Sequence, residues 1–175
     1  MLNWNAAAEE HRTRGLLSRK ALLDDLEEAL VPGSGPLLLV MFELGGLREI
    51  LTSLSAEEGD ALLVRLARRF SDEIGRDARS YESRRDQLIA LVPARGGDPS
   101  LERARTGLAE AAAPHRLEIV YGAALLPDEA RTPVEALERA DERLFVSRLT
   151  RGRDRRDARR VAAGLRGLPS RESRA

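Results

Sequence analysis

The stretch that most limits the fold of this chain runs from residue 81 to residue 93. It opens with polar and charged side chains and continues as an apolar run over residues 88–92, which Pro93 stops. Proline lacks the N–H that a strand inside a sheet must donate, so this run has the ending of a β-strand. The polar residues before it predict the turn of a hairpin, and the arms of a hairpin are antiparallel.

A second apolar run covers residues 37–42 and is followed by an acidic residue and two glycines. A run that is apolar at every position is typical of a strand buried on both faces. If the two strands are neighbours, Glu43 and Asp86 come together at one end of the sheet, beside Gly45 and Gly46. Carboxylates next to a glycine turn are the usual components of a site for a metal ion and phosphate.

Segments with apolar residues at helical spacing separate these strands from each other and from a third apolar run at residues 117–125. Ser18 is a helix N-cap candidate, and Ser55 with Glu58 forms a capping-box pattern. The predicted order is helix, strand, two helices, hairpin, helix, strand and helix, which indicates a mixed α/β (α+β) sheet rather than a doubly wound one. The buried side of the last helix is expected to consist of Leu137, Ala140 or Asp141, Leu144 and Phe145.

Length and composition favour one globular domain with a real core. Of the 175 residues, 42% are hydrophobic and none is cysteine, which excludes a disulfide framework and a thiolate metal site and fits a cytoplasmic protein. No apolar run approaches the roughly 18 residues of a membrane helix, and the first residues lack the pattern of a signal peptide. We therefore expect no membrane partner.

The charge is unevenly distributed, although the net charge of the chain is zero. From Arg148 to the C-terminus, ten arginines stand against three acidic residues, a local balance of +7. Such a tail can bind phosphates with a steep salt dependence. It lacks the aromatic residues that stack on bases, so nucleic acid is not the expected partner.

Five fragments of the chain, in the right order and at the right spacing, resemble the GGDEF family of diguanylate cyclase domains over residues 11–155. Each fragment is weak alone, but together they identify the fold. The motif that names the family falls on Arg84-Arg85-Asp86-Gln87-Leu88, and the entry motif keeps Gly15, Leu16 and Arg19. The first-strand motif lies on residues 43–51, and the long-helix motif begins at Gly59-Asp60. The closing motif lies on residues 140–148.

The resemblance implies a fold and a reaction. The fold is the ferredoxin-type palm of nucleotide cyclases, with a mixed central sheet of about five strands surrounded by helices. Family enzymes hold GTP at the sheet edge with two magnesium ions, which offset charge on the phosphates, and join two GTP molecules into cyclic di-GMP. Because the product has two identical halves, two such domains must face each other.

The resemblance also assigns roles to individual positions. Glu43 and Asp86 match the magnesium ligands, and both remain oxygen ligands for a hard cation. The positions around the nucleotide are Gly45, Gly46, Arg48, Asp60 and Arg148, of which Arg48 and Arg148 stand where the family has lysines that contact phosphate.

Several positions depart from the family pattern. Arg84 and Arg85 replace two glycines that allow the backbone to approach the nucleotide closely. Gln87 replaces an acid near the reacting groups, and Leu51 replaces the asparagine that reads guanine together with the acid at position 60. The family's inhibitory site would require Arg and Asp where this chain has Gly75 and Ala78, so product feedback is not expected.

These observations predict a domain that has lost catalysis, with a vestigial nucleotide pocket, and that works by binding in bacterial signalling. It requires no cofactor, and magnesium is expected only with bound nucleotide. The partner would be another protein, a second copy, or GTP or another guanine nucleotide. Two alternatives stay open: a weakly active cyclase that uses Glu43 and Asp86 for magnesium, and an anionic partner bound by the Arg-rich tail.

The predicted organisation has three parts. Residues 1–10 form a lead in which Trp4 is expected to pack on the domain or a partner, residues 11–155 form the GGDEF-like domain, and residues 156–175 form a flexible Arg-rich tail.

Overall fold

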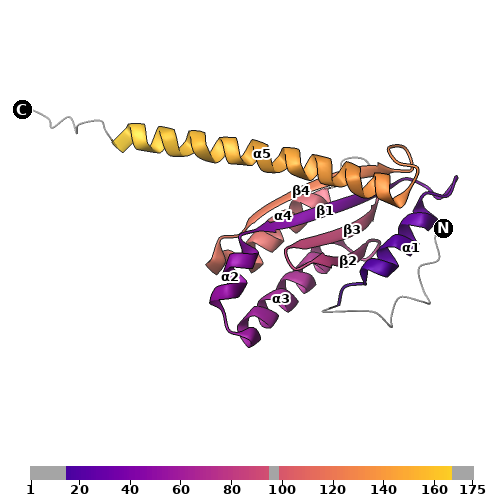
Figure 1. Cartoon of the computed structure of the whole chain (residues 1–175), viewed down its shortest axis with the longest axis horizontal. Coiled ribbons are helices and arrows are strands. Elements are labelled where there is room, and N and C mark those ends of the chain that lie inside the picture. The colour runs from indigo at the N-terminus through magenta and orange to yellow at the C-terminus, as the bar shows by residue number, and fades with distance from the viewer. Residues whose placement is uncertain (1–14, 95–98, 167–175) are drawn as a thin grey trace, which may run out of the picture.

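The computed structural model describes residues 15–94 and 99–166, with side chains as far as Arg151. A central sheet is covered by helices on both faces, and the last helix runs along one face and continues beyond the end of the sheet (Figure 1). The elements are α1 (Arg19–Ala29), β1 (Leu37–Gly45), α2 (Leu47–Ser53), α3 (Ala56–Ile74), β2 (Arg79–Arg84), β3 (Gln87–Pro93), α4 (Pro99–Ala111), a 3-10 helix (Ala113–His115), β4 (Glu118–Leu126) and α5 (Pro133–Arg166).

The four strands pair in the order β2-β3-β1-β4, and every neighbouring pair is antiparallel. The predicted hairpin is β2–β3, and the apolar run at residues 37–42 lies in β1 between β3 and β4. About five strands were expected, whereas the described residues form four. Beside β2, the described residues form a parallel bridge between Leu17 and Tyr81. The pairing does not continue past Leu17 because Ser18, the following residue, already caps α1.

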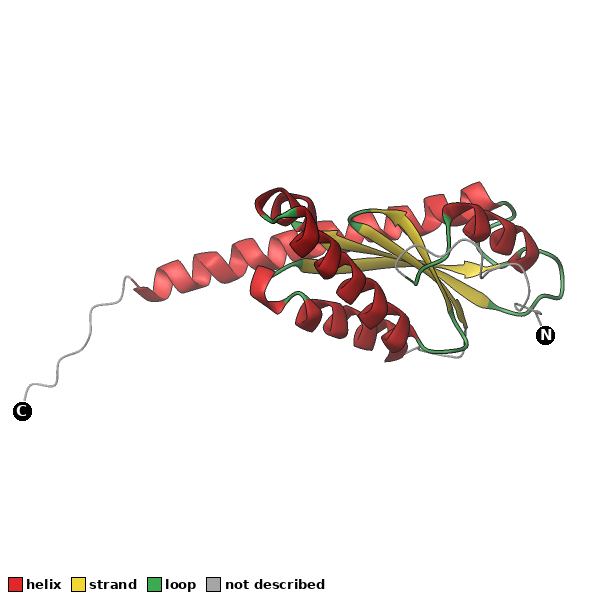
Figure 2. Cartoon of the chain, turned by 90° about the horizontal axis from the view of Figure 1, so that it is seen from below, coloured by secondary structure: helices red, strands yellow, loops and turns green. Residues whose placement is uncertain are grey.

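The sheet separates two apolar cores. One contains residues of α3 and α4, and the other contains residues of α1 and α5 on the opposite face (Figure 2). Alternate residues of a strand point to opposite faces, so the central strand β1 serves both cores. Val40, Phe42 and Leu44 lie in the first core, and Leu37, Leu39 and Met41 lie in the second.

The predicted helix starts are confirmed. The Ser18 hydroxyl accepts a hydrogen bond from the Ala21 N–H at 3.2 Å, which satisfies one of the unpaired donors at the start of α1. At the start of α3, the Ser55 hydroxyl accepts from the Glu58 N–H, and the Glu58 carboxylate accepts from the Ser55 N–H. This reciprocal capping box fixes where α3 begins.

Helix α5 lies close against β4 because Gly122 has no side chain. A Cβ atom at this position would lie 2.2 Å from the backbone nitrogen of Leu144. Ala140 and Leu144 are fully buried, as predicted, but the prediction for Phe145 was wrong, because its side chain is 52% exposed. Neighbouring helix positions differ by about 100° in direction, so Leu144 and Phe145 cannot both face the sheet.

The last helix extends further than the sequence suggested. Residues 156–166, expected to belong to a flexible tail, continue α5 in helical conformation. The lead at residues 1–10 with Trp4, and residues 167–175, lie outside the described residues. In the described part of the chain, no helix is both long and apolar enough to span a membrane.

Candidate functional site

The two predicted metal ligands meet at one end of the sheet. In the β1–β3 pairing, Glu43 lies opposite Gln87, the residue that follows Asp86. The Leu44 N–H donates a hydrogen bond to the Asp86 backbone oxygen at 2.9 Å. The sheet register therefore brings the carboxylates of Glu43 and Asp86 to the same edge, as expected from the sequence.

The predicted glycine turn connects β1 to α2 beside these acids. Gly46 has φ of +86°, a conformation that costs glycine little, and it occupies the N-cap position of α2. A Cβ atom on Gly45 would lie 3.3 Å from the backbone oxygen of Glu118 on β4, so the strand also needs a small residue there. This sharp turn places Arg48 in the first turn of α2.

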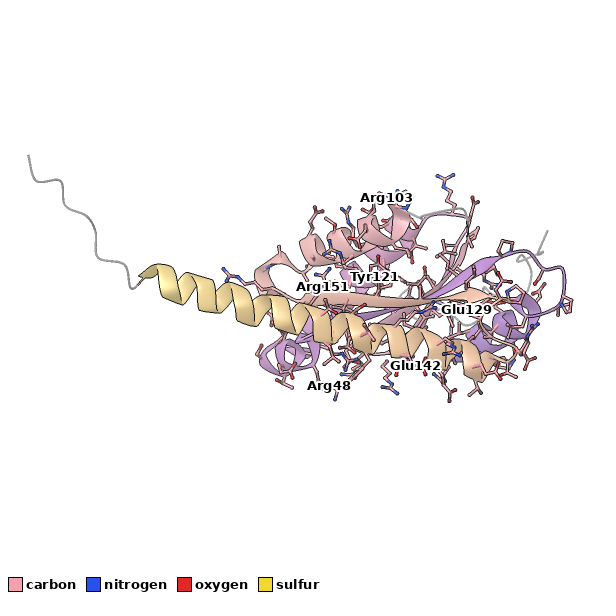
Figure 3. All side chains as sticks on the ribbon, turned by 90° about the horizontal axis from the view of Figure 1, so that it is seen from above. Arg48, Arg103, Tyr121, Glu129, Glu142 and Arg151 are labelled. Carbon is pink, nitrogen blue, oxygen red and sulfur yellow. The ribbon has the colours of Figure 1, made fainter. Side chains whose placement is uncertain are left out.

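Each acid is paired with an arginine from another element. The Arg48 Nη2 atom lies 2.8 Å from Asp86 Oδ2, and the Arg148 Nη2 atom of α5 lies 2.7 Å from Glu43 Oε2. The arginine side chains are 77% and 47% exposed, so both pairs face solvent. Figure 3 shows Arg48 on one side of α5, with Tyr121 and Arg151 on the other. The negative charge at this edge is thus neutralised within the protein.

This arrangement does not fit a magnesium ion. Magnesium requires near-octahedral oxygen coordination, commonly from one or two carboxylates together with phosphates and water. Here a guanidinium lies at hydrogen-bond distance from each of Glu43 and Asp86. Moreover, the described residues contain no group of three or more acidic, histidine or cysteine side chains that could hold a metal ion.

A pocket of about 420 Å³ opens beside the hairpin turn. Arg84 and Arg85 are exposed and line it, and neither has a positive φ, so the backbone conformation that glycine would allow is not used. The turn instead adjusts through a β-bulge between Glu82 and Arg84. The pocket is lined by Arg48, Leu51, Thr52, Arg84, Arg85 and Asp86, of which three are cationic.

The remaining predicted positions are also placed. Gln87, which stands where the resemblance leads us to expect an acid, is 8% exposed at the start of β3. Leu51 packs close to the start of α3, where its Cδ2 atom would lie 3.2 Å from a Cβ on Gly59. Asp60 follows Gly59 and is exposed, and it does not line the pocket. Leu51 therefore contacts the residue before Asp60, and its apolar side chain offers no hydrogen bond to a base.

Sequence reasoning missed two features of this site. Thr52 lines the pocket and was not singled out. The pairing of Glu43 with Arg148, and of Asp86 with Arg48, was not foreseen either. The resemblance placed two acids, Glu43 and Asp86, and two arginines, Arg48 and Arg148, around one nucleotide. Side chains of opposite charge that surround the same ligand lie within reach of each other, and this was the signal that could have predicted the pairs.

The comparisons with known proteins agree with this geometry. A family model described as diguanylate cyclase, GGDEF domain, matches residues 12–154. A sensory box/GGDEF family protein from Caulobacter crescentus CB15 is 26% identical, with a TM-score of 0.64 over 81% of this chain and 99% of that one. No curated protein matches the chain.

Two further solved structures share the fold at lower identity. The GGDEF domain of DgcB from Caulobacter crescentus, solved in complex with c-di-GMP, is 15% identical, with a TM-score of 0.65 over 83% of this chain and 93% of that one. The diguanylate cyclase SiaD from Pseudomonas aeruginosa, solved with its activator SiaC, is 20% identical, with a TM-score of 0.69 over 82% of this chain and 59% of that one. The sheet, the hairpin and the family match together show that this chain belongs to the GGDEF domain family.

Proposed function

We propose that this GGDEF domain does not synthesise cyclic di-GMP and acts as a cytoplasmic binding module in cyclic di-GMP signalling. The observation that carries the proposal is the pairing of both family metal positions, Glu43 and Asp86, with arginines at 2.7 and 2.8 Å. Phosphoryl transfer relies on metal ions that bridge phosphate oxygens and offset the charge at the attacked phosphorus. Internal ion pairs at these positions compete directly with such ions.

The other substitutions act in the same direction. Gln87 is neutral and buried, so it can serve neither as a base nor as an anionic ligand. If each lost contact with the reacting groups is worth about 3 kcal/mol, turnover falls by several orders of magnitude. The retained fold and the lost chemistry together favour binding over catalysis.

The pocket suits the phosphate groups of a guanine nucleotide better than its base. Arg48, Arg84 and Arg85 line it and are exposed, and arginine forks bind phosphate oxygens well without a metal ion. Leu51 cannot read the polar edge of guanine, and a site with one apolar partner discriminates poorly between bases. We therefore expect a similar affinity for GTP and ATP.

The direct test is to incubate the purified protein with GTP and magnesium and to measure cyclic di-GMP by chromatography, with an active diguanylate cyclase as the positive control. We expect no product at any protein concentration. Clear synthesis would overturn the proposal.

The second candidate is a weakly active cyclase. Its supporting observation is that Glu43 lies opposite Gln87, the residue after Asp86, and that both acids are paired with arginines whose side chains are exposed to solvent. If both arginines swing out, two carboxylates become free for magnesium. This candidate predicts a measurable activity that Asp86→Ala abolishes.

The third candidate is an anionic partner bound by the C-terminal arginines. Its supporting observation is that α5 continues to Arg166, which gives the six arginines between residues 151 and 160 a helical backbone. Deletion of residues 156–175 would then abolish partner binding, whereas unchanged binding would exclude this candidate.

A further inference from the structure

Helix α5 carries most of the exposed apolar surface of the described chain. Among the described residues, five large apolar side chains are at least half exposed. Four of them lie on α5: Val134 at 62%, Phe145 at 52%, Val146 at 59% and Leu149 at 50%. The fifth, Val31, lies just after α1. At about 100° per residue, the four positions on α5 fall within one third of the helix circumference.

Most of this apolar face is directed away from the domain, and Val146 at its margin also lines an open pocket between α5, α4 and β4. The buried residues Ala136, Ala140 and Leu144 form the opposite side of α5, which packs on the sheet. In Figure 3 the helix lies in front of β4, and no element of the described residues covers it in this view. A continuous exposed apolar face on an otherwise polar helix is a common mark of an interaction surface.

Charged residues continue the same face in both directions. Glu135, Glu138 and Glu142 precede the apolar centre at helical spacing, and all three are exposed. Positions 153, 156 and 160 continue the series after it, and all three are arginines. Along one face, α5 is therefore acidic at its start, apolar in its middle and basic towards its end.

We propose that α5 pairs with α5 of a second copy of this chain in antiparallel orientation, about a two-fold axis near the middle of the helix. A two-fold interface requires a surface that is complementary to itself. This face meets that requirement only when the helices run in opposite directions, because a parallel pair would place arginine against arginine.

One register satisfies the apolar centre and two of the three pairs of charged positions together. When Val146 lies opposite Leu149 of the second copy, Glu142 lies opposite Arg153 and Glu135 lies opposite Arg160. Each of these pairs is equidistant from the midpoint between residues 147 and 148, as a two-fold axis demands. The exposed Val134 also has an apolar counterpart, because position 161, which lies opposite it in this register, is a valine.

A second copy explains more of this face than another occupant does. An anionic partner such as nucleic acid would use only the basic segment and would leave the apolar centre and the acidic start unexplained. Pairing also supports the part of α5 that extends past the sheet (Figure 1), since helices in proteins gain most of their stability from packing. The surface is separate from the nucleotide pocket, none of whose lining residues belongs to α5.

The first experiment measures self-association by sedimentation equilibrium and compares two matched valine substitutions. Val146→Asp places a charge in the centre of the proposed interface, whereas Val31→Asp makes the same change at a similarly exposed position, 54% against 59%, outside it. We expect a dimer in the wild type, at least a tenfold weaker dimer with Val146→Asp, and no change with Val31→Asp. A monomer at all concentrations, or a dimer that Val146→Asp leaves intact, would overturn the proposal.

The second experiment tests the charge pairing. Glu142→Arg and Arg153→Glu should each weaken the dimer, and the double variant should restore it, because the opposite charges are then exchanged across the axis. Failure of the double variant to recover would contradict the register. If instead the chain is monomeric and Glu142→Arg strengthens its binding to a DNA oligonucleotide, the face is an anion-binding surface and the proposal is wrong.

The third experiment distinguishes antiparallel from parallel pairing. The chain has no cysteine, so introduced thiols report on the interface alone. A mixture of Glu142→Cys and Arg153→Cys chains should form a disulfide-linked dimer under mild oxidation. Each variant by itself should not, because its two thiols would lie about 16 Å apart along the helix axis. Efficient cross-linking of Glu142→Cys alone would indicate a parallel pair.

Discussion

Ion pairs between a carboxylate and arginine occur in two very different places in this protein. At the edge strand, Asp25 of α1 accepts a hydrogen bond from the Tyr81 hydroxyl at 2.6 Å and pairs with Arg79 at 2.8 Å. The side chains of Asp25 and Arg79 are only 10% and 14% exposed. At the candidate site, the Arg48 side chain that pairs with Asp86 is 77% exposed. The same residue types therefore have different roles at the two places, and the degree of burial determines the role.

Burial makes the first set structural. Desolvation raises the pKa of Asp25, and the hydrogen bond from Tyr81 and the charge of Arg79 oppose that shift. Burial also raises the pKa of Tyr81, so its hydroxyl stays protonated and donates. These bonds join α1 to the sheet edge. The exposed pairs at the site are cheap to open, because solvent screens both charges, so they can respond to a ligand.

The largest expected effect is on the buried set. Asp25→Ala removes the buried carboxylate that Arg79 and the Tyr81 hydroxyl contact, and we expect a loss of about 3 kcal/mol in the free energy of unfolding, measured by urea denaturation. Asp24→Ala, next to it, removes an exposed pair with Lys20 and should leave the free energy of unfolding nearly unchanged, because solvent screens both charges. Equal losses of unfolding free energy in the two variants would mean that the buried ion pair contributes no more to stability than the exposed one.

An intermediate effect is expected at Glu129, which holds the loop between β4 and α5. Its carboxylate accepts hydrogen bonds from the Arg143 guanidinium at 2.7 and 2.5 Å and from the Leu125 N–H at 2.7 Å. These contacts, the Arg143 bonds above all, lower the pKa of Glu129 from its ordinary value of 4.5. Its contribution to stability is therefore present above that value and is lost as pH falls through the folded pKa.

Glu129→Gln should accordingly destabilise the protein by about 1 kcal/mol at pH 7, and the difference from the wild type should shrink below pH 4.5. Urea denaturation at several pH values measures this difference. A gap between variant and wild type that stays constant down to pH 3 would show that the charge of Glu129 contributes nothing.

The smallest effect on stability is expected at the site itself. Arg48→Ala and Arg148→Ala should each change the free energy of unfolding by less than about 0.5 kcal/mol. The double variant leaves Glu43 and Asp86 without cations, so its affinity for manganese or magnesium ions should rise roughly tenfold. Arg103→Ala, on α4, is the control and should leave metal affinity unchanged. No gain in metal affinity would mean that the arginines do not block the site.

The fold could be predicted well from the sequence because its signals are local. The apolar run closed by Pro93 and the serines at positions 18 and 55 mark strand and helix ends in the chain itself. The position of Glu43 next to Asp86 followed from the hairpin and from the family resemblance. These features depend on neighbours in sequence or on a regular sheet register.

The features that could not be predicted depend on contacts between residues far apart in the sequence. Arg148 is 105 residues from Glu43, and the two meet only because Gly122 lets α5 lie close on β4. The predicted buried side of α5 was wrong at Phe145, because apolar character alone does not determine which of two adjacent residues faces the sheet. The length of α5 was missed because its charged end suggested a solvated tail.

The central claim, that arginines stand where the family's cations would bind, is tested most directly by calorimetric titration of GTP into the protein with and without magnesium. Arg48 and Arg148 already neutralise Asp86 and Glu43, so magnesium has no free carboxylates to bind. Magnesium also binds the triphosphate itself and lowers its negative charge, so the heats of the two titrations will differ. We predict that magnesium does not raise the affinity of the protein for GTP. Binding that magnesium strengthens tenfold or more would contradict the account and would support the weakly active cyclase instead.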